Sequence, residues 1–145
     1  MLLMFSGTLL IGLVLALVVE SATMARLERK AEALALSDAD RQRARTAALS
    51  RTGRLMIVVE CALFLAIALV ATAAGIAESA ESGVWILFFA SMLLAGPGLG
   101  FGAVGTLLLF RGLHKAGTDR TVSDEIWAAV GATVTLLGPI VLLLR

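Results

Sequence analysis

The chain is poor in the residues that build most catalytic and metal centres. Its 145 residues include one cysteine (Cys61), one histidine (His114) and no tyrosine. A single cysteine excludes an intramolecular disulfide, and one histidine beside one cysteine does not supply the ligand set of a typical zinc or haem site. We therefore expect no catalytic residues, no metal and no cofactor, and we interpret the chain as a non-enzymatic protein.

Charged and aromatic residues are also scarce. Only 16% of the residues are charged, against about a quarter in ordinary soluble domains, and 6% are aromatic. The 12 basic and 11 acidic residues nearly balance. Proteins that bind nucleic acid present a basic surface and stack aromatic side chains on bases, so this composition argues against nucleic acid as a partner.

Apolar sequence is what the chain has in excess. Hydrophobic residues make up 59% of it, and several runs approach or exceed the roughly 18 residues that indicate a membrane span. In a bilayer the backbone polar groups must bond within the protein, so such runs form helices. We predict an all-α integral membrane protein of a single domain, with four transmembrane helices packed as two antiparallel hairpins. The four spans cover residues 2–19, 55–77, 84–110 and 126–144.

Basic residues are distributed unevenly between the connections. Residues 20–54 carry eight Lys and Arg, the third connection carries three, and the opposite side has only Arg145. Basic loops of membrane proteins stay in the cytoplasm. This bias predicts that both termini lie on the non-cytoplasmic side of the lipid bilayer. The small size and the Ala-, Leu- and Arg-rich composition favour a bacterial inner membrane.

The segment 20–54 is predicted to be a cytoplasmic helical hairpin that extends the first pair of spans. It is rich in helix formers and contains one glycine and no proline. Ser37-Asp38-Ala39-Asp40 has the S-x-x-D pattern of a helix start, so the first helix should continue to about Leu36 before the chain turns. Thr121-Val122-Ser123-Asp124 repeats this pattern before the fourth span.

A turn at Ser37 aligns opposite charges on the two helices of this hairpin. Exposed ion pairs of this kind contribute only about 0.2–1 kcal/mol each, so they would select the register rather than hold the fold together. A charged, solvated pair of helices, or contact of the bases with anionic lipid headgroups, are alternative interpretations. The predicted pairs are Glu20 with Arg54, Glu32 with Arg43, and Glu28 with the region of Arg45.

Glu60 is the one acidic or basic side chain well inside a predicted span. Helical rise places it roughly 8 Å past the start of the second span. A charge near the bilayer centre costs on the order of 3 kcal/mol, so Glu60 is a candidate intramembrane carboxyl for binding a proton or a cation. The alternative is a structural carboxyl that reaches the interface or bonds a neighbouring helix. We favour the structural interpretation, because the remaining spans offer no second ionisable side chain to relay a proton.

Small residues recur at the four-residue spacing that lets helices approach closely in lipid. On the first span they are Thr8, Gly12 and Ala16, and the hairpin register places this stripe near Glu60. We therefore expect the stripe to form a seam with the second span, across which Glu60 could form a hydrogen bond.

The third span contains a glycine-rich string at residues 96–105. Within it, Gly98 and Gly102 form a G-x-x-x-G packing motif, and Pro97 is expected to tilt or kink the helix. A G-x-G-x-x-G pattern at residues 100–105 does not indicate a dinucleotide site, because no strand precedes it. Gly131 begins a similar small-residue stretch in the fourth span. Trp85 and Trp127 lie near the starts of their spans, as aromatic interface anchors do.

These features predict a small non-enzymatic membrane protein that serves as a structural or accessory subunit of a larger membrane complex. Its partners would be other membrane-protein subunits or further copies of itself, with the cytoplasmic helical hairpin as a docking surface. The competing interpretation is a small oligomeric ion or proton channel or transporter that uses Glu60.

Overall fold

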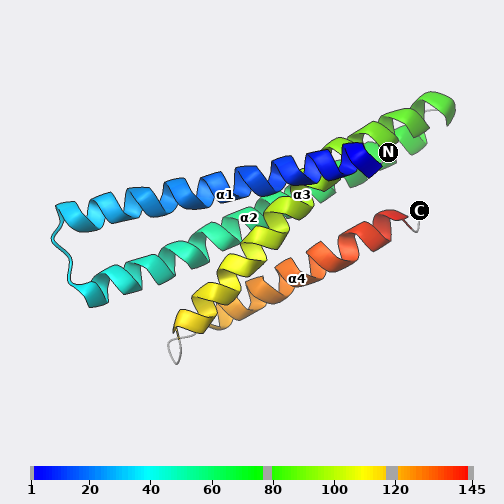
Figure 1. Ribbon diagram of the computed structural model, residues 1–145. Helices are drawn as coiled ribbons and strands as arrows, with labels where there is room; N and C mark the ends of the chain where they lie inside the picture. The colour runs from blue at the N-terminus through cyan, green and yellow to red at the C-terminus, as the bar shows by residue number, and fades with distance from the viewer. Residues whose placement is uncertain (1, 77–79, 117–120, 144–145) are drawn as a thin grey trace.

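The chain folds into long helices. The computed structural model describes residues 2–76, 80–116 and 121–143, and all of the regular structure in these ranges is helical. The helices are α1 (Leu2–Ala33), α2 (Asp38–Ile76), α3 (Ala80–Ala116) and α4 (Val122–Leu143). Figure 1 shows that the start of α1 and the end of α4 lie at the same end of the molecule, opposite the α1–α2 turn. The all-helical prediction is confirmed.

Three of these helices are long and apolar enough to cross a membrane. By length and composition the candidate spans are Phe5–Ala33, Asp38–Ala73 and Phe88–Ala116. The fourth predicted span, 126–144, lies in α4 apart from residue 144, which is outside the described residues. Large apolar side chains remain exposed on all four helices, as expected of surfaces that face lipid or another protein.

Helix α3 lies at the centre of the packing. Half of its apolar window is buried (50%), compared with 11% for α1 and 22% for α2. It packs against each of the other three helices, and its contact with α2 is the most extensive. The contact between α1 and α2 is small by comparison. The α1–α2 and α3–α4 pairs therefore share one packing centre rather than forming two separate hairpin units.

The small-residue stripe of α1 packs closely against α3 at Thr8 and Gly12. A Cβ atom on Gly12 would lie 2.5 Å from the Cα atom of Pro97, and one on Gly100 would lie 2.7 Å from the carbonyl carbon of Gly12. Ala16, one turn further along α1, is fully buried. The stripe therefore packs closely on α3, whereas the hairpin register paired it with the second span. The glycine-rich string of α3 has no side chains at these positions, so the backbones of α1 and α3 meet there directly.

The two sides of α3 use different glycines. Gly96 and Gly100 face α1, whereas a Cβ atom on Gly105 would lie 2.9 Å from the carbonyl oxygen of Gly53 in α2. Helix α3 is continuous through Pro97. It crosses α1 and α2 obliquely in Figure 1. Glycines on two faces thus allow one helix to contact two neighbours closely.

The turn after α1 is a Schellman motif with an alanine in the left-handed position. The Leu36 amide donates to the carbonyl of Ala31, and the Ala35 amide donates to the carbonyl of Glu32. Ala35 has a φ angle of 46°, a conformation that an L-residue with a Cβ atom adopts at a cost. Helix α1 consequently ends at Ala33, three residues before the predicted end.

Both predicted helix starts are confirmed. The Asp40 amide lies 3.3 Å from the Ser37 hydroxyl, which in turn donates to the Asp40 carboxylate at 2.7 Å. Thr121 and Asp124 make the same two contacts at the start of α4. In each pair the bond from the Asp amide satisfies one backbone donor that the first helical turn leaves without a partner.

Candidate functional site

Glu60 is sealed inside the helix packing. The exposed fraction of Glu60 is 0%. The part of α2 around it is otherwise apolar, so a buried carboxyl is unusual there. The Thr135 hydroxyl of α4 donates a hydrogen bond of 2.9 Å to the Oε1 atom of Glu60. The carboxyl therefore joins α2 to α4. The hairpin register predicts instead a hydrogen bond from Glu60 to the first helix.

A missing side chain on α3 makes room for this carboxyl. A Cβ atom on Gly102 would lie 2.1 Å from both the carboxyl carbon and the Oε1 atom of Glu60. Gly98, the other glycine of the G-x-x-x-G motif, has ordinary space, because its Cβ atom would lie 3.6 Å from that of Leu63. Within the motif, Gly102 is the position at which packing demands glycine.

A second level of contacts lies one helical turn away. A Cβ atom on Gly131 of α4 would lie 2.5 Å from the Thr106 hydroxyl of α3 and 2.4 Å from the Cδ1 atom of Ile57 of α2. Thr106 follows Gly102 by one turn and Thr135 follows Gly131 by one turn, so each pair shares a helix face. The three helices thus meet at two successive levels, one centred on Glu60 and one on Thr106.

Two oxygen atoms at these levels have no hydrogen-bond partner. They are Oε2 of Glu60 and the hydroxyl of Thr106, both buried, and neither bonds to any atom in the described part of the chain. Leaving such a group unpaired costs about 1–3 kcal/mol. Glu60, Thr106 and Thr135 bring oxygen atoms from three helices into one region, where a proton or a hard cation would find acceptors. Over residues 2–76, 80–116 and 121–143, no group of three or more His, Cys, Asp and Glu side chains is placed so that it could hold a metal ion.

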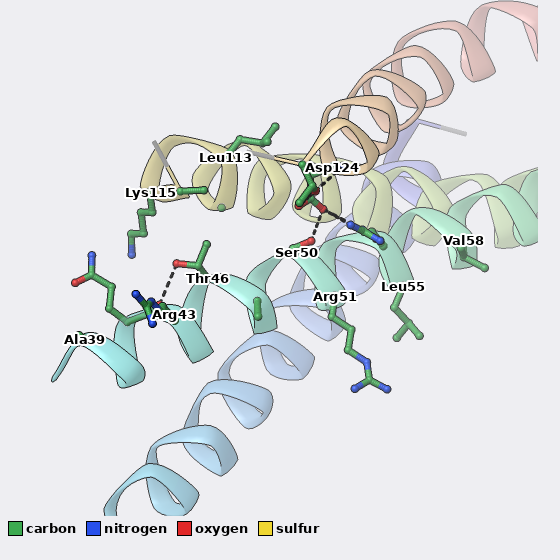
Figure 2. Close-up of a pocket in the computed structure, with 16 residues that line it drawn as sticks. Ala39, Arg43, Thr46, Ser50, Arg51, Leu55, Val58, Leu113, Lys115 and Asp124 are labelled. Carbon is green, nitrogen blue, oxygen red and sulfur yellow. Dashed lines mark hydrogen bonds and ion pairs between the residues drawn. The ribbon is translucent and has the colours of Figure 1, made fainter. Parts of the chain in front are cut away.

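A second polar cluster lies where α2, α3 and α4 leave the apolar segments. Asp124 of α4 accepts hydrogen bonds from the Nε and Nη2 atoms of Arg54, at 3.0 and 2.6 Å, and from the hydroxyl of Ser50. Figure 2 shows Ser50 on α2 directed at Asp124. Together with the Glu60–Thr135 bond, this cluster connects α2 to α4 at two points.

The environment of Asp124 favours its charged form. Partial burial opposes ionisation, but hydrogen bonds from Ser50, Thr121 and Arg54, with the positive charge of Arg54, outweigh it and hold the pKa of Asp124 below its ordinary value. Asp124 therefore carries its negative charge at neutral pH and balances that of Arg54.

The predicted ion pairs of the helical hairpin form only in part. Glu28 and Arg45 form an ion pair, with both side chains about half exposed. Arg54 pairs with Asp124 in place of Glu20, and these are the two ion pairs in the described ranges.

The third predicted pair, Glu32 with Arg43, does not occur among the described residues. Arg43 lines the cavity beside α4, and Glu32 lines the cavity between α1 and α2. Positions two residues apart point to nearly opposite sides of a helix. Arg45 faces α1, so Arg43 faces away from it, and Arg41 lines the same cavity as Glu32.

The two tryptophans have different surroundings. Trp85 is 61% exposed and lies beside Phe88 and Phe89, with ring centroids 6.1 and 6.3 Å away. Trp127 is half-buried and packs against the cluster that contains Ile57 and Leu109. An exposed aromatic group at the start of α3 suits an interface anchor, whereas Trp127 contributes to internal packing. The anchor role of both residues stays a prediction.

Sequence reasoning did not identify Thr135 as the partner of Glu60 or Ser50 as a partner of Asp124. Thr135 lies four residues after Gly131, which is a helical spacing that could have connected it to the predicted packing face. Asp124 was identified as a helix cap, and its second role as the partner of Arg54 depends on tertiary contacts. Comparison with protein families, with curated proteins and with solved structures finds no match to this chain.

Proposed function

We propose that this protein is a small non-enzymatic subunit of a larger membrane complex, in which the helical hairpin of residues 20–54 docks a partner. The length of this hairpin carries the proposal. Helices α1 and α2 have 32 and 39 residues, whereas about 20 residues cross the hydrocarbon layer. The excess forms a charged, largely exposed arm. Such an arm is unnecessary for moving an ion across the bilayer, but it suits the recognition of another protein.

We further propose that all four helices span a bacterial inner membrane, with both termini on the non-cytoplasmic side. The bias of Lys and Arg toward residues 20–54 and the third connection supports this orientation. The bond between Thr135 and Glu60 supports α4 as a fourth span, because α4 must run beside the apolar part of α2 to form that bond.

Cysteine labelling tests the topology. In a Cys61→Ser background, Ser37→Cys should react with an impermeant maleimide only after the cytoplasmic face is opened. Ser82→Cys, in the first turn of α3 and before the predicted span 84–110, should react in cells whose inner membrane is intact. The reverse pattern would overturn the proposed orientation.

Native mass spectrometry of the tagged protein, extracted from its own membrane in mild detergent, tests the subunit role. We expect a heteromeric complex of fixed stoichiometry. Arg26 and Arg29 are exposed on the arm, so a variant with Arg26→Glu and Arg29→Glu should lose the partner without losing helical content. Arg111→Glu, an exposed position on α3, is the matched control and should retain it. A monomer or homo-oligomer alone would contradict the proposal.

A second candidate function is an oligomeric channel or transporter for a proton or cation that binds at Glu60. The unpartnered Oε2 atom of Glu60 and the unpartnered Thr106 hydroxyl favour it. Flux measured in vesicles that contain the purified protein would decide. This candidate is supported if the unchanged protein gives flux and the Glu60→Gln variant does not. It is excluded if neither the unchanged protein nor the variant gives flux.

A further inference from the structure

A cavity of about 560 Å³ lies between the parts of α1 and α2 that form the charged arm. We call it the basic groove. Its lining extends along α1 from Thr23 to Lys30 and along α2 from Ala44 to Thr52, which is roughly 10–12 Å of each helix. Small or apolar side chains that are half-buried form its floor, among them Leu27, Ala44 and Ala48.

The lining of the basic groove carries four positive charges and no negative one. The bases are Arg26, Arg29 and Lys30 of α1 and Arg51 of α2. All four side chains are exposed, and none of them takes part in an ion pair within the described part of the chain. Like charges gathered around one space repel one another, so the groove favours an occupant that brings negative charge.

The opposite side of the arm differs in charge. A cavity of about 610 Å³ there has three acids and three bases in its lining, so its charges balance. Glu28 and Glu32 line this cavity and not the basic groove, because positions two residues apart, such as Glu28 and Lys30, point to nearly opposite sides of a helix. The whole arm has eight bases and five acids. The arm of a second copy of this chain would therefore be repelled from the groove.

The distance of the basic groove from the bilayer favours a protein over a lipid as its occupant. In the proposed topology the first span ends at Val19, and the headgroup layer beyond it is about 5–7 Å thick. Arg26, Arg29 and Lys30 follow Val19 by 7, 10 and 11 residues, which is roughly 10–17 Å of helical rise. Arg51 lies four residues before the second span, about 6 Å by helical rise. Three of the four bases therefore lie in water beyond the lipid headgroups.

We propose that the basic groove binds an acidic segment of the partner subunit, whose carboxylates contact Arg26, Lys30 and Arg51. The small side chains of Ala44 and Ala48 in the floor allow the segment to approach α2 closely. Two helical turns of the segment, about 11 Å, match the length of the groove. This inference rests on the proposed subunit role, and it adds the side of the arm that docks and the charge of the partner.

Photocrosslinking of the full-length protein in its own cells identifies the occupant. A photoreactive phenylalanine analogue replaces Ala44, which lines the basic groove. In a control protein the analogue replaces Gln42, which lines the cavities on the other sides of α2. Mass spectrometry of the cross-linked peptides should find, at Ala44 and not at Gln42, a peptide of another protein in which acids outnumber bases. A neutral or basic peptide, a lipid or a peptide of this chain at Ala44 would overturn the proposal.

A variant with Lys30→Gln and Arg51→Gln removes one base from each helix of the basic groove. It should reduce the yield of the Ala44 cross-link ~2- to 30-fold, the range expected for the loss of two exposed ion pairs. The matched control has Lys115→Gln and Arg43→Gln, which remove the same residue types from the cavity beside α4, and it should keep the yield. Equal losses in both variants would mean diffuse attraction to the positive arm and would overturn the groove as the site. Far-ultraviolet circular dichroism of each variant verifies that the helices are intact.

Native mass spectrometry of the same proteins separates failure of this inference from failure of the subunit role. A heteromeric complex that forms equally well with the Lys30→Gln and Arg51→Gln variant would overturn the acidic segment and leave the subunit role in place. The absence of a heteromeric complex from the unchanged protein would contradict both proposals.

Discussion

The α-carbon of Gly102 and the carboxyl group of Glu60 are in direct contact. A Cβ atom on this glycine would lie 2.1 Å from the carboxyl carbon, which is closer than non-bonded atoms approach. The same carboxyl bonds to Thr135 of α4. One buried acid of α2 thus contacts α3 and bonds to α4. Its fit depends on a side chain that α3 lacks.

Gly102→Ala should reduce the free energy of unfolding by about 1–3 kcal/mol, as overpacking does in other well-packed interiors. The added methyl group must displace the Glu60 carboxyl and weaken its bond to Thr135. Gly98→Ala is the matched control, because its Cβ atom has ordinary contact distances, and it should leave stability unchanged or raise it. Unfolding in mixed micelles, followed by circular dichroism, measures both variants.

A double-mutant cycle shows whether the carboxyl is the cause. In a Glu60→Ala background, the space that the carboxyl occupied is available to the methyl group. Gly102→Ala should therefore cost less there than in the unchanged protein. Equal costs in both backgrounds would mean that the methyl group acts on some other part of the packing.

Glu60→Gln should preserve stability within about 1 kcal/mol, because the amide oxygen still accepts the bond from Thr135 and the side chain keeps its shape. Glu60→Leu removes the acceptor at similar volume and leaves the Thr135 hydroxyl without that partner. It should cost about 1–3 kcal/mol. The same unfolding assay applies. A leucine variant more stable than the glutamine variant would show that the bond to Thr135 does not stabilise the packing.

Local features of the fold could be predicted from the sequence. The apolar runs predicted all four helices, and the patterns at Ser37 and Thr121 predicted where α2 and α4 begin. These features depend on backbone hydrogen bonds and on side chains within one helical turn. Such interactions are determined by neighbours in the sequence, so they could be derived without knowing the tertiary packing.

The choice of neighbouring helices could not be derived in the same way. The predicted pairing of Glu20 with Arg54 assumed that helices adjacent in the sequence make the main contacts. In fact α3 is the central helix, and Arg54 bonds to Asp124 of α4. The glycine spacing of α3 held a relevant signal, because Gly100 and Gly102 point to nearly opposite sides of a helix. Glycines on two sides indicate a helix packed between two neighbours. A single G-x-x-x-G motif places glycines on one side only and indicates one neighbour.

Asp124→Asn should lower the free energy of unfolding by about 1.5–3 kcal/mol, which is typical of hydrogen bonds to charged groups. The carboxylate accepts bonds from Arg54, Ser50 and Thr121, and an amide replaces one acceptor oxygen with a donor. Glu125→Gln is the control, because this neighbouring acid is exposed and forms no ion pair in the described residues. Similar losses in both variants would assign the effect to the charge of the helix start alone.

The Asp124 cluster should also make stability depend on acid pH. Because its pKa is lower in the folded protein, the stabilisation is fully present above the ordinary aspartate pKa of about 3.9. It is lost as the pH falls from there through the lowered value. Thermal unfolding in detergent at pH 7 and at successive acid values measures this decline. The decline should be smaller in the Asp124→Asn variant, and an equal decline would assign the dependence to other carboxyl groups.

Ala35→Gly should stabilise the turn between α1 and α2. Ala35 holds a φ angle of 46°, which costs an L-residue about 1–2 kcal/mol and costs glycine little. The greater freedom of glycine in the unfolded chain offsets part of this gain, so we expect a net increase of about 0.5–1 kcal/mol. Ala25→Gly, the same substitution at an exposed position inside α1, should instead lower stability by about 1 kcal/mol. Opposite signs in the two variants, measured by the same unfolding assay, would establish that the left-handed conformation at Ala35 is strained. A loss of stability in both would show that the turn does not hold Ala35 in that conformation.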